Sequence, residues 1–239
     1  MRRLRLSTGP AALFGAFLLA ALLALLPLRL VLGVADAGAA GLSARRVDGS
    51  IWAGSLSEAR LGGLALGDLD ARVSPWRLLL GQLSVALDGN GTARPLHGRV
   101  TMRRHGFGVE ELTAGLAAGS LFQPLPVTGL DLDAVSVRFE DGACREAEGR
   151  VRATLGPGPA GIALPPEIAG AVRCEGGALL VPLAGQAGAE SVTLRVEGDG
   201  RYRAEFTLPA ADPATVEQLT RLGFQPAGNG YRLVAEGRF

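Results

Sequence analysis

The chain has 239 residues, of which 48% are hydrophobic, and a mean hydropathy of +0.26. Its 35 Gly and 14 Pro follow no triplet period and 20% of its residues are charged, so a collagen-like or globally disordered chain is excluded. The net charge is +1, but residues 1–29 hold four Arg and no acidic residue, which leaves −3 for the remainder. Because nucleic acid binding requires a basic surface, we expect no nucleic acid partner.

The first apolar segment predicts a membrane anchor. Residues 10–28 carry no charged side chain. About 20 apolar residues in a helix span a hydrocarbon core of about 30 Å. We therefore assign residues 1–9 to a cytoplasmic tail, residues 10–32 to a single transmembrane helix and residues 33–239 to a periplasmic β domain.

The charges that flank this segment set its orientation. Arg2, Arg3 and Arg5 precede it, and Arg29 follows it, where a long cationic side chain can reach the headgroups. Basic residues stay on the cytoplasmic side, so the amino terminus is expected inside and the bulk of the chain in the periplasm of a Gram-negative cell. Cleavage as a signal peptide near residues 35–37 (Ala-Asp-Ala) is the alternative, and it stays open.

Beyond the anchor, apolar and polar residues alternate in short runs separated by Gly-containing turns. This pattern is typical of an antiparallel, curved β-sheet and gives a mainly β fold class. In chain order, the expected strands lie near residues 51–52, 59–61, 64–73, 84–87, 98–102, 135–139, 191–197, 201–208 and 231–239. Residues 198–200 (Gly-Asp-Gly) predict a hairpin turn between two of these runs.

Two short helices interrupt the strands. Residues 75–80 begin with Pro and stop at Gly81, which predicts one helical turn. The second helix has Asp212 as its N-cap, Pro213 in its first turn and Gly223 at its end. Its apolar stripe consists of Val216, Leu219 and Leu222.

The two cysteines predict a disulfide. Cys144 and Cys174 are the only pair, and the compartment assigned to them is oxidising. A redox pair usually has the Cys-x-x-Cys spacing, which is absent, and two Cys without a nearby His make a poor zinc site.

No cluster of side chains predicts catalysis, and we assign no catalytic, cofactor-binding or metal-binding residue. Glu110 and Glu111 would point to opposite faces of a strand, which suits a solvated edge better than a shared proton. His97 and His105 have no nucleophile beside them, and a nucleophile elbow is absent. Residues 103–105 (Arg-Arg-His) form a basic run that favours a solvated turn over contact with anionic lipid, and residues 90–92 favour an Asn-Gly turn.

Several segments together resemble protein N of the type II secretion system. Residues 47–54 (VDGSIWAG) and 61–68 (LGGLALGD) resemble two successive strands of that family, with Ser50 in place of the commoner Thr. Residues 75–81 resemble its Pro-led, Leu-rich turn. Its paired-Cys segments correspond to residues 139–149 and 174–183, and its closing pattern to residues 198–202 and 222–224.

The resemblance implies an accessory inner-membrane component of the machinery that exports folded proteins across the outer membrane. Its expected partners are the inner-membrane platform and the outer-membrane secretin, and no enzymatic activity or cofactor is implied. The family is also distantly similar to AsmA-type proteins, whose curled sheets accommodate lipid. An envelope protein that handles or organises lipid through an apolar β groove is therefore the alternative function.

Overall fold

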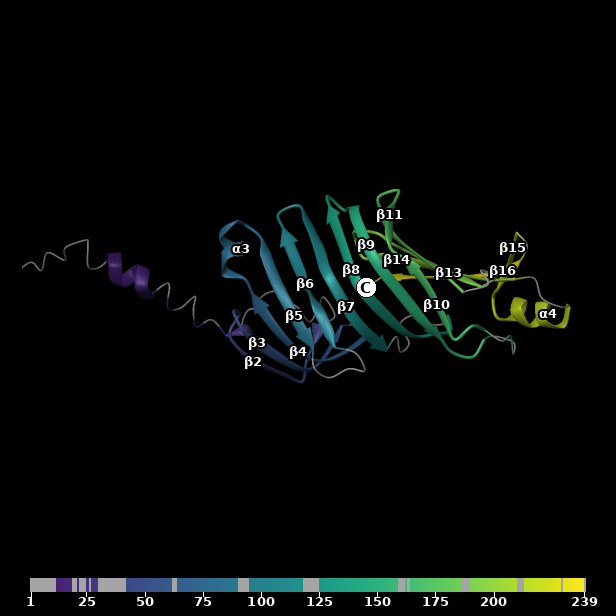
Figure 1. Cartoon of the computed structure of the whole chain (residues 1–239), viewed down its shortest axis with the longest axis horizontal. Coiled ribbons are helices and arrows are strands. Elements are labelled where there is room, and N and C mark those ends of the chain that lie inside the picture. Colours follow the sequence, from purple (N-terminus) through teal and green to yellow (C-terminus); the bar gives the residue numbers. More distant parts are fainter. Residues whose placement is uncertain are drawn as a thin grey trace, which may run out of the picture.

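The computed structural model describes residues 12–18, 21, 25, 27–29, 42–61, 64–89, 95–117, 125–158, 162, 164–185, 190–209, 213–228 and 230–238. The strands in these residues form one antiparallel, curved sheet of sixteen strands, which confirms the mainly β prediction (Figure 1). Along the sheet the order is β1-β3-β4-β5-β6-β7-β8-β9-β10-β12-β13-β14-β16-β15, with β2 on β3 and β11 on β12.

Most strands follow their chain neighbours as hairpins. Their bounds are β1 (Leu42–Ser43), β2 (Arg46–Gly49), β3 (Gly54–Leu61), β4 (Leu64–Val73), β5 (Leu83–Gly89), β6 (Leu96–Arg103), β7 (Gly106–Ala117), β8 (Val127–Glu140), β9 (Ala143–Leu155), β10 (Glu167–Ala171), β11 (Arg173–Glu175), β12 (Ala178–Ala184), β13 (Ser191–Val196), β14 (Arg201–Pro209), β15 (Gln225–Ala227) and β16 (Gly230–Arg238).

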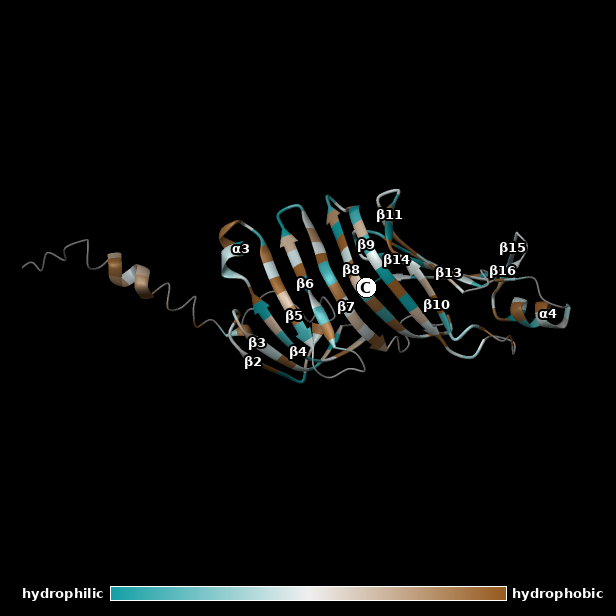
Figure 2. Cartoon of the chain, viewed as in Figure 1, coloured by the Kyte–Doolittle hydropathy of each residue, from teal (hydrophilic) through white to brown (hydrophobic). Residues whose placement is uncertain are grey.

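Alternating residues give the sheet an apolar inner face and a polar outer face, visible as bands along the strands in Figure 2. For example, β14 lies between β13 and β16, and its residues Ala204, Phe206 and Leu208 are buried, whereas its Arg203 is exposed. The predicted turn at residues 198–200 connects β13 to β14, as expected. The hairpin of β8 and β9 turns at Asp141 and Gly142, whose φ angles of +49° and +75° suit the twist of the flanking strands.

The inner face holds two hydrophobic clusters. The N-terminal cluster consists of Leu28, Leu56, Ala59, Leu69, Leu96 and Ala114. The C-terminal cluster is larger and is centred on Phe206, Leu208 and Leu219, which are fully buried. Each such side chain stabilises the fold by about 1.5–3 kcal/mol on burial. Leu132 on β8 packs against both clusters and joins them.

Both predicted short helices are present, at opposite ends of the molecule (Figure 1). Helix α3 (Pro75–Leu79) begins after Ser74 and is followed by Gly81, whose φ is +74°. Helix α4 (Pro213–Arg221) ends before Gly223, whose φ of +90° favours glycine. Asp212, the expected N-cap of α4, lies outside the described residues.

Ile51 and Trp52 were expected in a strand, and this expectation is wrong. They lie in a bend between β2 and β3. Gly49 pairs with Gly54 directly across this bend, so the chain reverses direction at these residues instead of extending through them.

The predicted transmembrane segment is described only in part, at residues 12–18, 21, 25 and 27–29. Residues 12–18 are helical, and no helix in the described part of the chain is long and apolar enough to cross a bilayer. At the far end of the segment, Pro27 forms a β-bridge with Ser50, and Leu28 is buried in the N-terminal cluster. Pro27 and Leu28, which lie within the predicted anchor, therefore contact the sheet.

Candidate interaction surfaces

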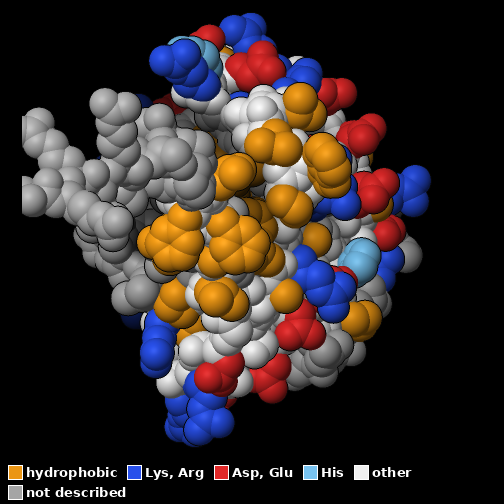
Figure 3. Space-filling model, turned by 90° about the vertical axis from the view of Figure 1, so that its left-hand side faces the viewer, with side chains coloured by type: hydrophobic (Ala, Val, Ile, Leu, Met, Phe, Trp, Pro, Cys, Tyr) orange, Lys and Arg blue, Asp and Glu red, His pale blue; other side chains and the backbone are white. Residues whose placement is uncertain are grey.

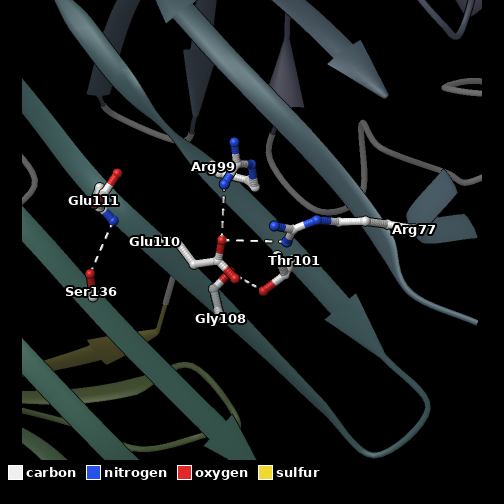
Figure 4. Close-up of polar contacts among 7 residues, drawn as sticks. All are labelled: Arg77, Arg99, Thr101, Gly108, Glu110, Glu111 and Ser136. Carbon is white, nitrogen blue, oxygen red and sulfur yellow. Dashed lines mark hydrogen bonds and ion pairs between the residues drawn. The ribbon is translucent and has the colours of Figure 1, made fainter. Parts of the chain in front are cut away.

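A polar cluster on the outer face connects helix α3 to the sheet (Figure 4). Glu110 on β7 accepts from Arg99 Nη1 on the neighbouring strand β6 at 3.2 Å and from Arg77 Nη1 on α3 at 3.5 Å. Beside it, the Thr101 hydroxyl donates to the Gly108 carbonyl. All three charged side chains are half-exposed, so the cluster positions α3 more than it stabilises the core.

The structure corrects the interpretation of the carboxylate pair. Strand β7 lies between β6 and β8, so Glu110 and Glu111 are not on an edge. The register shifts between Val109 and Leu112, and Glu111 has a φ of +50°. Its backbone N–H donates to the Ser136 hydroxyl at 3.0 Å. Glu110 therefore anchors two arginines, while Glu111 occupies a β-bulge.

Helix α3 presents apolar side chains to solvent. It has no buried residue, and Trp76, Leu79 and Leu80 are 77%, 78% and 76% exposed. Three further apolar residues are exposed, namely Leu83 on β5, Met102 on β6 and Phe107 on β7. They lie side by side, because Leu83 pairs with Met102 and Met102 pairs with Phe107. We define the α3 patch as Trp76, Leu79, Leu80, Leu83, Met102 and Phe107. Figure 3 looks at this end of the molecule and shows hydrophobic side chains gathered among Arg and acidic ones.

The α3 patch was missed by sequence reasoning, which interpreted residues 75–80 as a helical turn and as part of the family resemblance, and not as an exposed surface. The available signal was composition: one Trp and three consecutive Leu in a segment too short to bury them all. The strand partners Leu83, Met102 and Phe107 could not be found this way, because only the register brings them together.

The two histidines are exposed and each faces an aspartate. His97 Nδ1 lies 2.5 Å from Asp88 Oδ1 on the neighbouring strand β5, and His105 Nδ1 lies 3.8 Å from Asp141 Oδ1. His97 is on β6, as expected for a strand residue, whereas His105 is in the β6–β7 turn. The basic run at residues 103–105 thus ends a strand and forms a turn, and residues 90–92 lie outside the described residues.

Cys144 and Cys174 form the predicted disulfide, with their Cα atoms 5.5 Å apart. The bond joins β9 to β11, and Cys144 is buried. The backbone N–H of Cys144 also donates to the Gly177 carbonyl in the turn after β11. The disulfide thus holds the β11–β12 hairpin against β9 and has a structural position.

A row of ion pairs lies on the outer face of the C-terminal half. Arg203 contacts Glu205 at 2.8 Å and Glu236 at 2.5 Å, and Arg232 contacts Glu205 at 3.3 Å. The hydrogen bond from Arg203, together with the nearby charge of Arg232, lowers the pKa of Glu205 below its ordinary value of 4.5. In the adjacent turn, the backbone N–H of Arg201 lowers the pKa of Asp199.

One edge of the sheet is open along most of a strand. Strand β16 pairs with β14 over its whole length, but β15 covers only residues 230–232 on its other side. Within the strands that the structure describes, residues 233–238 have no neighbour on that side. An uncovered strand edge offers backbone donors and acceptors to a further strand.

The residues expected to orient the anchor are mostly outside the described chain. Arg29 is described and exposed, directly after the buried Leu28. Arg2, Arg3 and Arg5 are not described. Over the described residues, no group of three or more His, Cys, Asp and Glu side chains is arranged to hold a metal ion.

Comparison with known proteins identifies the family. The family model described as type II secretion system protein N matches residues 40–234. A curated protein of Vibrio cholerae serotype O1, named type II secretion system protein N, is 28% identical over 208 residues, which are 80% of this chain and 82% of the relative. No solved structure matches. Since the family model covers nearly the whole sheet, the chain belongs to the type II secretion system protein N family.

Proposed function

We propose that the chain is a membrane-anchored periplasmic scaffold of the type II secretion machinery, acting in the export of folded proteins across the outer membrane. Family membership supports a role in type II secretion, and the match over residues 40–234 is the observation that carries it. The proposed partners are the inner-membrane platform and the outer-membrane secretin. We assign no catalytic step to the protein.

Anchoring in the inner membrane is supported by the sequence. The uncharged segment at residues 10–28 has three Arg before it and Arg29 after it. The disulfide between Cys144 and Cys174 suits an oxidising compartment such as the periplasm.

Scaffolding is supported by a surface suited to association. The edge of β16 at residues 233–238 has no described neighbour strand and is suited to strand addition. On the inner face, Leu219 of α4 and Phe224 are buried in the C-terminal cluster, so this half is filled by the chain itself. A C-terminal half filled by its own side chains favours the scaffold over the alternative of an apolar groove that carries lipid.

A reporter at the carboxyl terminus tests the topology. We expect alkaline phosphatase fused after Phe239 to be active, because this enzyme matures only outside the cytoplasm, and a fluorescent protein that folds only in the cytoplasm to be dark. In the matched control, Arg2→Ala, Arg3→Ala and Arg5→Ala together should reduce phosphatase activity, since they remove the positive charge that holds the tail inside. Activity of the cytoplasmic reporter alone would overturn the proposed topology.

Crosslinking tests the scaffold. A photoreactive amino acid at Glu236, beside the open edge, should give adducts with a secretion component in cells that assemble the machinery. The same group at Arg221, an exposed residue of α4, serves as the control and should give none. Deleting the gene should also lower the amount of secreted cargo and raise its periplasmic pool. Unchanged secretion together with no adduct at Glu236 would contradict the proposal.

A further inference from the structure

Exposed large hydrophobic side chains are distributed very unevenly over the molecule. Among the described residues they fall in residues 13–25, in and just after α3, and on β6 and β7, with a single one elsewhere, Leu222 after α4. Figure 1 shows that the first groups lie at one end of the long axis and α4 at the other. Soluble surfaces scatter such side chains singly, so this concentration marks a contact surface.

Helix α3 is held in this exposed position by polar contacts. Arg77 reaches Glu110 on the sheet, and the Arg77 carbonyl accepts from the backbone N–H of Gln82. On the entering side, the Ser74 N–H donates to the Ser84 carbonyl. The contacts fix both ends of the helix while Trp76, Leu79 and Leu80 stay in solvent.

The register places the end of the predicted anchor on the same rim as α3. Pro27 bridges to Ser50, four residues before β3 begins at Gly54. Gly54 pairs with Ala71, close to the end of β4, and α3 follows directly. Leu25 is exposed while Leu28 is buried in the sheet, and three residues span at most about 10 Å. A bilayer that holds the preceding residues therefore lies beside this rim.

The charges around the α3 patch suit a lipid surface. Arg103 and Arg104 lie between Met102 and Phe107 in the β6–β7 hairpin, and neither forms an ion pair within the described chain. Acidic residues are also close, but Glu140 pairs with Arg138 and Asp141 faces His105. The two free cations thus flank exposed Trp and Leu side chains, which is the combination that favours the membrane interface.

We propose that the α3 patch inserts into the headgroup region of the same membrane that holds the anchor, with Arg103 and Arg104 on lipid phosphates. The sheet then rests on the bilayer by the rim that carries α3 and the β6–β7 turn. The inference rests on the proposed membrane anchor, and it adds a second contact between the protein and lipid.

Fluorescence quenching by lipid tests the contact in the full-length protein. The chain has two Trp, so Trp52→Phe leaves Trp76 as the single probe. The matched control carries Trp52→Phe, Trp76→Phe and Leu222→Trp, which places the probe on an exposed position at the other end. Both are reconstituted in vesicles of phosphatidylethanolamine and phosphatidylglycerol, with or without bromine on the acyl chains.

We expect brominated lipid to quench Trp76 at least about twofold more than the control probe, because the apolar face of an interfacial helix is buried about 5–10 Å into the boundary between headgroups and acyl chains. Alkaline carbonate extraction of the same vesicles separates the two claims. Equal quenching of both probes in protein that resists extraction would overturn the lipid contact and leave the anchor intact. Equal quenching in protein that is extracted would overturn both.

Crosslinking in cells distinguishes lipid from other occupants of the patch. A photoreactive group at Leu79 should give lipid adducts and no discrete protein adduct. One adduct of twice the chain mass would mean that a second copy covers the patch, and one adduct of another mass would mean a different protein. Either result would overturn the proposal, since Leu79 is exposed and the substitution leaves the core unchanged.

Discussion

The two short helices have the same kinds of start and stop residues, but one packs into the core and the other is exposed to solvent. Both begin with Pro and end before a Gly with positive φ. Helix α4 places Leu219 in the C-terminal cluster with no exposed surface, whereas α3 buries none of its residues. The N-terminal half therefore keeps an apolar element outside its own core, while the C-terminal half closes on itself. The comparison shows that an apolar stripe indicates a contact but not whether the contact is within the chain.

Substituting one Leu in each helix tests this difference most directly. Leu219→Ala should lower the free energy of unfolding by about 3–5 kcal/mol, because it removes a fully buried side chain and leaves a cavity. Leu79→Ala should change it by less than about 0.5 kcal/mol, because Leu79 is already in solvent. Urea unfolding of the two variants measures both values, and similar losses would refute the contrast between the helices.

The disulfide should give the next largest effect, confined to the C-terminal half. Replacing Cys144 and Cys174 together with Ser should cost about 3–4 kcal/mol, since the bond closes a loop with a sequence separation of 30. Hydrogen exchange should show faster opening of the β11–β12 hairpin, with β3–β6 serving as the internal reference. Equal acceleration in both halves would mean that the sheet unfolds as one unit.

In the N-terminal half, Glu110→Gln should loosen α3 with little effect on the core. The two ion pairs are half-exposed, so their loss should cost at most about 1 kcal/mol. We expect amide exchange to increase in residues 75–82 and to stay constant in β14. The control is Asp88→Asn on β5, which weakens the contact with His97 and should leave α3 unchanged.

The smallest expected effect is a pH dependence in the C-terminal half. Arg203 and Arg232 lower the pKa of Glu205, so the native state holds the carboxylate more strongly than the unfolded state does. The stabilisation is therefore present when the pH is above the pKa of Glu205 in the unfolded chain. It is lost as the pH falls through the lower pKa of Glu205 in the native state. Thermal unfolding of Glu205→Gln should differ most from that of the parent at neutral pH, and the difference should shrink below about pH 4. A difference that grows in acid would contradict this sign.

The sequence predicts local elements better than their connection. The alternation in β13, β14 and β16 and the turn at residues 198–200 are visible as residue patterns, and so are both helices. A single sheet of sixteen strands is not, because the pairing of β10 with β12 around β11 depends on contacts distant in the chain. The bulge at Glu111 was equally hidden, since a non-Gly residue with positive φ has no clear sequence signal.

For the candidate surfaces, the disulfide could be predicted because only two Cys exist. The partners of Glu110 could not, since Arg77 lies 33 residues away and reaches it only after α3 has been placed beside β5. The interpretation of Glu110 as an edge residue failed for the same reason. An edge is a property of the whole sheet, and the pattern within one strand does not contain it.

Leu132 touches both hydrophobic clusters from the middle of the longest strand. A single hydrogen-bonded sheet runs through that point, so the strand pairing continues without a break from one cluster to the other in the described residues. A load applied at the rim near α3 would pass into both halves of the protein through the paired strands β7, β8 and β9.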